Sequence, residues 1–95
     1  MVEIVWSPQA IEDLRSIQVY IGRDSPHFAV LIARRLVDAV ERLAAFPESG
    51  RVVPEVGDPG MREVLWRHYR IVYRVGGSAL EIVTVFHGAQ LFRGP

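Results

Sequence analysis

Three basic or titratable side chains stand among the apolar positions of two strand-like stretches near the C-terminal end of the sequence. Arg70 and Arg74 lie within residues 68–75, and His87 ends residues 80–87; both stretches alternate apolar and polar residues, as half-buried strands do. An arginine inside an apolar hairpin usually has an ionic partner or a bound anion. Histidine titrates in the range that suits proton transfer. A functional site is therefore expected on the face that carries these side chains.

A glycine-rich turn joins the two stretches, which predicts a β-hairpin. A two-residue loop at Gly77-Ser78 is favoured because it sets Arg74 against Glu81 and matches apolar groups elsewhere. In this register Arg70 lies diagonal to His87, within reach of a long side chain. The other expected cross-strand pairs are Val75 with Leu80, Tyr73 with Ile82, Val72 with Val83, Ile71 with Thr84, Arg70 with Val85, Tyr69 with Phe86 and His68 with His87.

Each of these side chains also has a structural interpretation. Arg70 could be held in an ion pair with Glu55 or Glu63, and Arg74 is best interpreted as half of a cross-strand pair. His87 could be a half-buried, hydrogen-bonded residue at a strand end. Glu55 lies in a loop rich in proline and glycine, where a solvated carboxylate is the default expectation.

Two helices are predicted in the first half of the chain. Ser7-Pro8 and Ser25-Pro26 each combine a capping hydroxyl with proline at the first helical position, and Gly22 supplies a stop for the first helix. A short loop between them makes an antiparallel helical hairpin. The second helix carries a broad apolar stripe made of Ala29, Ile32, Ala33, Leu36, Val40, Leu43 and Ala44.

The remaining strands and the fold class follow from the same patterns. Residues 2–6 and 62–66 are predicted strands, while residues 46–50 break the second helix and residues 51–60 are expected to form a surface loop. The order β-α-α-β-β-β predicts an α+β fold, with a mostly antiparallel sheet that carries the N-terminal αα-hairpin on one face. The opposite face, with the charged residues of the hairpin, is expected to be more open.

Composition limits the chemistry. The 95 residues are expected to form one domain, 1–95, and an apolar fraction of 49% excludes disorder. There is no cysteine, and all eleven basic residues are arginine against eleven acidic ones. Disulfides, thiolate metal sites and lysine-based catalysis are therefore excluded, and no global field favours nucleic acid.

The sequence also predicts location and cofactors. No signal peptide or membrane-length apolar run is present, so a cytoplasmic protein without membrane partners is expected. His27, His68 and His87 lack the spacing of helical metal ligands. We expect neither a metal nor another cofactor.

Six segments together carry a family resemblance. They are Trp6-Ser7-Pro8 with Ala10, Asp13 and Leu14; Phe46-Pro47-Glu48-Ser49-Gly50-Arg51; Pro54-Glu55; Arg62-Glu63; Tyr69-Arg70-Ile71-Val72-Tyr73-Arg74-Val75; and Val85-Phe86-His87-Gly88. In this order and spacing they resemble the ParE/RelE superfamily of bacterial type II toxin–antitoxin toxins over nearly the full chain. The resemblance implies a small toxin in a hetero-oligomer with a cognate antitoxin, which wraps a segment around its surface.

Members of the superfamily divide by target. RelE-like toxins cleave mRNA on the ribosome, whereas ParE-like toxins inhibit DNA gyrase. The long helical hairpin and residues 69–75 resemble the ParE branch. The neutral, lysine-free chain also departs from the basic surface that RelE-like enzymes bring to the ribosome. We therefore interpret the chain as a ParE-like toxin that inhibits gyrase by binding and is not an enzyme.

Two alternatives stay open. Some RelE-like nucleases have a Glu, an Arg and a His in places that match Glu55, Arg70 and His87. In mRNA cleavage by the 2′-hydroxyl, Glu55 would take a proton, Arg70 would stabilise the phosphorane and His87 would protonate the leaving oxygen. The second alternative is an inactive member that only binds its antitoxin and contributes to regulation of their operon.

Contacts with the target or the antitoxin are expected at Arg62, Trp66, Arg70, Leu91 and Phe92. Leu91 and Phe92 belong to an apolar tail with little nearby sequence to bury it, which predicts a docking surface. A tail folded back on its own sheet is the alternative. Trp66 could equally be a core residue, and Arg62 could instead hold the preceding loop to the sheet.

Overall fold

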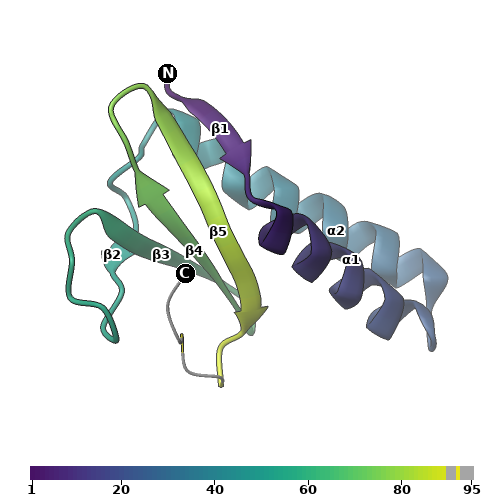
Figure 1. Cartoon of the computed structure of the whole chain (residues 1–95). Coiled ribbons are helices and arrows are strands. Elements are labelled where there is room, and N and C mark those ends of the chain that lie inside the picture. Colours follow the sequence, from purple (N-terminus) through teal and green to yellow (C-terminus); the bar gives the residue numbers. More distant parts are fainter. Residues whose placement is uncertain (90–91, 93–95) are drawn as a thin grey trace.

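The computed structural model describes residues 1–89 and 92, which form two helices on one face of a five-stranded sheet (Figure 1). The elements, in chain order, are β1 (Glu3–Trp6), α1 (Pro8–Gly22), α2 (Pro26–Glu41), a 3₁₀ turn (Arg42–Ala44), β2 (Arg51–Val52), β3 (Met61–Trp66), β4 (Tyr69–Val75) and β5 (Ala79–His87). The sheet order is β1-β5-β4-β3-β2; β1 runs parallel to β5 and all other neighbours are antiparallel. The predicted α+β fold is confirmed. In this described part, neither helix is long and apolar enough to cross a membrane.

Both helices begin at the predicted caps. The Ser7 hydroxyl accepts the Ala10 N–H at 3.0 Å, and the Ser25 hydroxyl accepts the Phe28 N–H at 3.2 Å. Proline follows each cap, and α1 ends at Gly22 as expected. The caps satisfy backbone N–H groups that have no partner within the helix. Hydrogen bonds between neighbouring residues therefore determine where each helix begins.

The helix-covered face of the sheet holds the larger core. All seven residues of the predicted stripe are buried, and Leu36 and Val40 of α2 are fully so. They pack against Ile71 and Tyr73 of β4 and Ile82 of β5. This face is apolar because a helix stripe and alternate strand residues meet on it.

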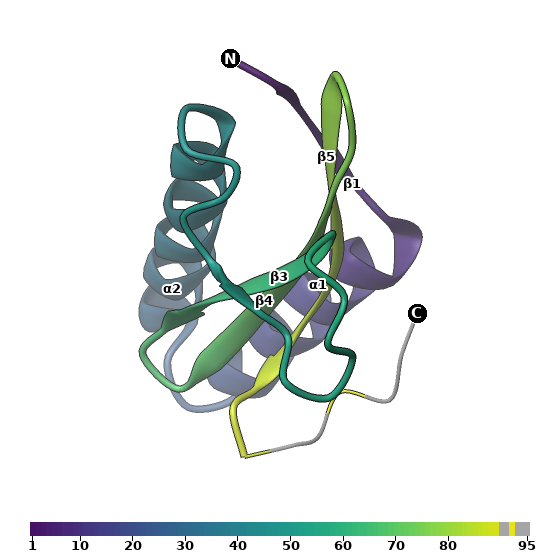
Figure 2. The ribbon, with the colours of Figure 1, turned by 90° about the vertical axis from the view of Figure 1, so that its left-hand side faces the viewer.

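The other face of the sheet is covered as well, which corrects the expectation of a more open face. The segment between β2 and β3 lies across it, on the near side in Figure 2, with the helices behind. Val53 from this segment and Phe92 from the C-terminal region pack with apolar residues of three strands. The strand residues of this second core are Met61, Val72 and Val83, with Phe86 packed against them.

The hairpin register is partly as predicted. Val75 opposes Leu80, Arg74 opposes Glu81 and Tyr73 opposes Ile82, but a β-bulge beyond Tyr73 shifts every later pair by one residue. Arg70 therefore opposes Phe86, not Val85, and His87 opposes Tyr69, not His68. The expected diagonal placement of Arg70 and His87 was wrong.

The bulge is stabilised by polar groups from the start of α1. The Ser7 hydroxyl donates to the Val83 carbonyl at 2.8 Å, and the Asp13 carboxylate accepts the Val85 N–H at 3.0 Å and the Thr84 hydroxyl. An extra residue in one strand leaves backbone groups without ladder partners. Ser7 and Asp13 supply partners for groups at this position.

The predicted loop over residues 51–60 contains a short strand. Arg51 and Val52 form β2, which pairs with Glu63 and Arg62 of β3, and β3 itself begins at Met61. The strand was missed because two residues carry no readable alternation. It forms an edge of the sheet and brings Arg51 opposite Glu63.

Candidate functional site

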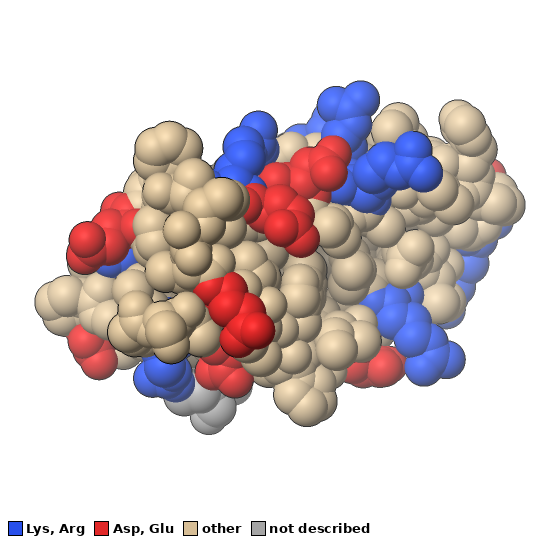
Figure 3. Space-filling view, turned by 90° about the horizontal axis from the view of Figure 1, so that it is seen from above, with Lys and Arg blue, Asp and Glu red and all other residues tan. Residues whose placement is uncertain are grey.

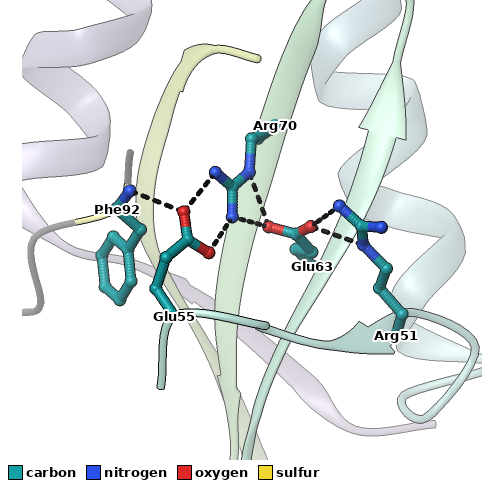
Figure 4. Close-up of polar contacts among 5 residues, drawn as sticks. All are labelled: Arg51, Glu55, Glu63, Arg70 and Phe92. Carbon is teal, nitrogen blue, oxygen red and sulfur yellow. Dashed lines mark hydrogen bonds and ion pairs between the residues drawn. The ribbon is translucent and has the colours of Figure 1, made fainter. Parts of the chain in front are cut away.

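Arg70 is the centre of the polar structure on the loop-covered face. It is only 5% exposed, and its guanidinium makes hydrogen bonds of 2.7 Å to two carboxylates (Figure 4). Nε donates to Glu63, while the two terminal nitrogens donate to the two oxygens of Glu55. This is the fork-like geometry in which an arginine–carboxylate pair is strongest.

The contacts continue across the sheet through Glu63. Its side chain is fully buried on β3, and one of its oxygens accepts the Arg51 Nε–H at 2.6 Å. The result is a row of four residues with two charges of each sign: Arg51, Glu63, Arg70 and Glu55, called here the ion-pair chain. Buried charges are tolerated when each is paired and hydrogen-bonded in this way.

Glu55 anchors the covering segment and the C-terminal region together. Hydrogen bonding to Arg70, helped by the Phe92 N–H at 2.9 Å, lowers the pKa of the Glu55 carboxyl from 4.5 to about 2. The same contacts with Glu55 raise the pKa of Arg70. Glu55 is therefore not the solvated carboxylate that its loop predicted. A carboxylate with so low a pKa is a weak general base at neutral pH.

His87 lies apart from the ion-pair chain, at the exposed end of β5. Its Nδ1 accepts the Ala89 N–H at 3.2 Å, its ring stacks on His68 with centroids 6.0 Å apart, and Tyr69 meets it edge-on. The structure thus brings Glu55 and Arg70 into direct contact. His87 and Arg70 both line one hollow.

That hollow has a volume of about 280 Å³ and is named here the cationic hollow. Its basic lining includes Arg51, Arg67 and His68, which the sequence interpretation did not select. Arg67 has a left-handed backbone (φ 52°) in the turn between β3 and β4, and its guanidinium lies 5.3 Å from the centre of the Trp66 ring. In the sequence, the adjacent basic residues Arg67 and His68 in one tight turn could have indicated this basic lining. The full lining is Arg51, Leu65, Arg67, His68, Arg70, His87, Gly88 and Ala89.

The residues expected to contact a target or antitoxin occupy different environments. Arg62 donates to the carbonyls of Pro59 and Gly50, at 3.1 and 3.0 Å, as expected for a residue that holds the loop to the sheet. Phe92 is 8% exposed and stacks on Phe86, so for this residue the tail folds back on the sheet. Leu91 lies outside the described residues.

Trp66 lines a second hollow, of about 240 Å³, between the end of α2 and the β3 edge. This hollow, named here the apolar groove, is bordered by exposed Phe46 and Leu65. Its full lining is Ala39, Arg42, Leu43, Phe46, Ser49, Val64, Leu65 and Trp66.

Arg74 and Glu81 face each other at 3.8 Å and are both about half exposed, which confirms the cross-strand pair. Within residues 1–89 and 92, no group of three His, Asp or Glu side chains is arranged to hold a metal ion.

A helical hairpin on a five-stranded sheet, with a charged network on the far face, places the chain among small α+β folds. The chain belongs to the ParE toxin family, since the family model for the "ParE toxin of type II toxin-antitoxin system, parDE" matches residues 4–92. It is 38% identical over 92 residues to Toxin RelE2 of Caulobacter vibrioides, across 96% of this chain and 100% of that one. The protein is thus a toxin of a type II toxin–antitoxin system, in the ParE/RelE superfamily.

Two solved structures share the fold. The "chromosomal ParDE TA system from P. aeruginosa" superposes with a TM-score of 0.76 at 26% identity, over 92% of this chain and 96% of that chain. The toxin–antitoxin complex RelBE2 from Mycobacterium tuberculosis gives a TM-score of 0.63 at 20% identity, over 95% and 97%. At 20% identity, the similarity to the Mycobacterium complex shows a shared fold alone.

Proposed function

We propose that this toxin inhibits DNA gyrase by binding to it and performs no chemistry of its own. The observation that carries the proposal is the ion-pair chain. Arg70 and Glu55, two of the three residues that a nuclease would need, are already neutralised by each other and by Glu63. An arginine held by two carboxylates offers little net charge to a phosphorane, and Glu55 is a poor base.

The charge distribution supports a protein target over RNA. The net charge is zero, and on the face seen in Figure 3 basic and acidic side chains are interspersed. Binding to ribosomal RNA usually draws on a large phosphate-driven component that requires clustered basic residues. The match to the ParE family model adds to this support.

The proposal includes an antitoxin that neutralises the toxin in a hetero-oligomer. The similar Pseudomonas structure is of a ParDE toxin–antitoxin system, which supports a partner of this kind here. A gyrase-directed toxin would act in the cytoplasm. Trp66, which packs against the helix-side core and is partly buried, lines the apolar groove and is a proposed contact residue there.

Induced expression in bacteria tests the proposal when DNA and mRNA are followed in the same culture. Inhibition of gyrase is expected to relax plasmid DNA or to cause DNA breaks within minutes, while bulk mRNA keeps its length. Rapid loss of full-length mRNA with unchanged supercoiling would refute gyrase as the target. A culture in which neither changes would point to the inactive, antitoxin-binding alternative.

A RelE-like mRNA endonuclease is the second candidate, and the cationic hollow favours it. Arg67, His68 and His87 line a concavity large enough for a phosphodiester, and exposed histidines can transfer protons. The relative named Toxin RelE2 is also consistent with it. Purified toxin added to translating ribosomes would then cut mRNA, and His87→Gln would slow cutting by on the order of 10²–10⁴.

A further inference from the structure

One border of the sheet is formed by β1, which pairs in parallel with β5 on one side only (Figure 1). The start of β1 is covered on its outer side, because the Val2 N–H donates to the Ala44 carbonyl at 3.1 Å. Past this contact, the described residues place no further strand or backbone hydrogen bond on that side of β1. An uncovered strand edge presents backbone donors and acceptors to an incoming chain.

The register shows which backbone groups of β1 point outward. The N–H groups of Glu3 and Ser7 donate toward β5, at 3.1 and 3.0 Å, and Val5 has the same parity. Successive residues of a strand direct their backbone groups to opposite sides. Ile4 and Trp6 therefore each present an N–H and a C=O at the border of the sheet.

The side chains of β1 alternate between the two faces. Ile4 and Trp6 are half-buried and pack against the helix-side core, whereas Glu3 and Val5 are exposed, Val5 by 42%. Free edges are commonly protected by proline or by basic side chains, and the sequence of β1 contains neither. The strand is therefore open to pairing along its second half.

We infer that β1 pairs with β1 of a second copy of this chain, antiparallel about a two-fold axis at Val5. In this register Ile4 of each copy opposes Trp6 of the other, and each such pair exchanges both its N–H···O bonds. The outward backbone groups of both residues are thus satisfied. A two-fold contact of this kind uses the same patch on both copies and closes on itself. The inference depends on the sheet edge and not on the proposed action on gyrase.

The side chains of β1 are complementary to themselves in this register. Val5 faces Val5 of the other copy in a non-hydrogen-bonded pair, where side chains approach most closely. Ile4 meets Trp6 on the helix side of the sheet, and aromatic and β-branched side chains stabilise a sheet when they are paired. Glu3 opposes Ser7, so no like charges face each other.

The alternative axis at Ile4 is less favourable. It would set Val2 against Trp6 of the other copy, and the Val2 N–H is already bonded to Ala44. The axis at Val5 needs no such bond to break. This difference is the reason why the inference commits to one register.

The dimer would leave both hollows accessible. No residue of β1 lines the apolar groove or the cationic hollow. The two sheets would therefore join into one while the surfaces proposed to contact a target stay free. Each copy contributes a single short strand, so the contact is expected to be small and to dissociate on dilution.

The absence of cysteine from the sequence allows a direct test. Val5→Cys would place two thiols across the axis with Cα atoms about 4.5 Å apart, within the range that a disulfide spans. Air oxidation of the purified variant, catalysed by copper phenanthroline, is expected to give mainly the covalent dimer. Val56→Cys, at a position 41% exposed and outside β1, is the matched control and should stay mainly monomeric. Equal yields of dimer from the two variants would overturn the inference.

The register has its own control in Glu3→Cys. Glu3 lies on the same face as Val5 but opposes Ser7 of the other copy, so its thiols would be too far apart to join. We expect much less covalent dimer from Glu3→Cys than from Val5→Cys. More dimer from Glu3→Cys would overturn the axis at Val5.

Backbone pairing is tested separately by Ile4→Pro. Proline removes the outward N–H and is tolerated on an edge strand where that N–H faces away from the sheet. Ile4→Ala is the control, because it loses the same side chain and keeps the N–H. Analytical ultracentrifugation should show a concentration-dependent wild-type dimer, and a dimer dissociation constant about tenfold higher for Ile4→Pro than for Ile4→Ala. Equal constants, or a wild type that is monomeric at every concentration, would overturn the inference; if circular dichroism shows Ile4→Pro unfolded, the cysteine variants decide.

Discussion

The two faces of the sheet are covered by different means. On one face, two capped helices present an apolar stripe, and the core there contains only apolar and aromatic side chains. On the other face the cover is an irregular segment and Phe92, and both buried charged residues of the described chain, Glu63 and Arg70, are found there. A helix can hold itself against a sheet by burying a stripe, whereas an irregular segment needs specific anchors.

The ion-pair chain is that anchor. The segment between β2 and β3 contributes only Val53 to the second core, and Glu55 ties the segment to Arg70 and to the Phe92 backbone. The residues that resemble a nuclease site thus stabilise the fold here. The comparison predicts that changes on the two faces differ in size and in their dependence on pH.

The largest effect is expected for Arg70→Ala. It removes one of the two arginine partners of the fully buried Glu63 carboxylate and frees the covering segment. Removing one member of a buried ion pair typically costs about 3–5 kcal/mol. Urea unfolding followed by circular dichroism measures the loss. Arg74→Ala, in the half-exposed pair with Glu81, should lower the free energy of unfolding by less than about 1 kcal/mol. Equal losses for the two variants would contradict the anchoring role of Arg70.

The next effect belongs to the helix-covered face. Leu36 is fully buried under α2, so Leu36→Ala should cost about 2–5 kcal/mol through lost burial and a cavity. Because the members of the helix-side core include no carboxyl or histidine side chain, the loss should be the same at neutral and at acidic pH. Leu31→Ala on the same helix, at a position 37% exposed, is the control and should change stability far less. A loss of stability in Leu36→Ala that varies with pH would contradict the predicted difference between the two faces.

A smaller, pH-dependent effect is expected for Glu55→Gln. The pKa of Glu55 in the folded protein is about 2, below its ordinary 4.5, so its ionised form stabilises the fold fully above about pH 4.5. This stabilisation is lost as the pH falls toward 2. The melting-temperature difference between wild type and Glu55→Gln should therefore be largest near neutral pH and shrink on acidification. Glu48→Gln, with a side chain 77% exposed, should show no such trend; a constant difference at Glu55 would contradict the assigned pKa.

Local signals predicted the helix-covered face well. Ser7 and Ser25 are each followed by proline and accept a hydrogen bond from the N–H three residues further along. The apolar stripe of α2 repeats with a helical period that can be counted in the sequence. The bulge in β5 could not be found in this way. It depends on Ser7 and Asp13, which are more than seventy residues away from their partners in the sequence.

The candidate site was predicted only in part. Both carboxylates proposed as partners of Arg70 do contact it, because a charge inside an apolar strand must be neutralised. The basic residues of the turn, Arg67 and His68, were missed, since their role depends on a concavity that four strands build together. The burial of Phe92 could not be decided from the sequence, because the C-terminal region that carries it shows no periodic pattern.

Purified toxin assayed in parallel against DNA gyrase and against translating ribosomes tests the central claim most directly. The expected result is that wild type and His87→Gln block ATP-dependent supercoiling equally and leave ribosome-bound mRNA intact. Cleavage of mRNA by the wild type that His87→Gln abolishes, with gyrase unaffected, would contradict action by binding and assign the chain to the nucleases.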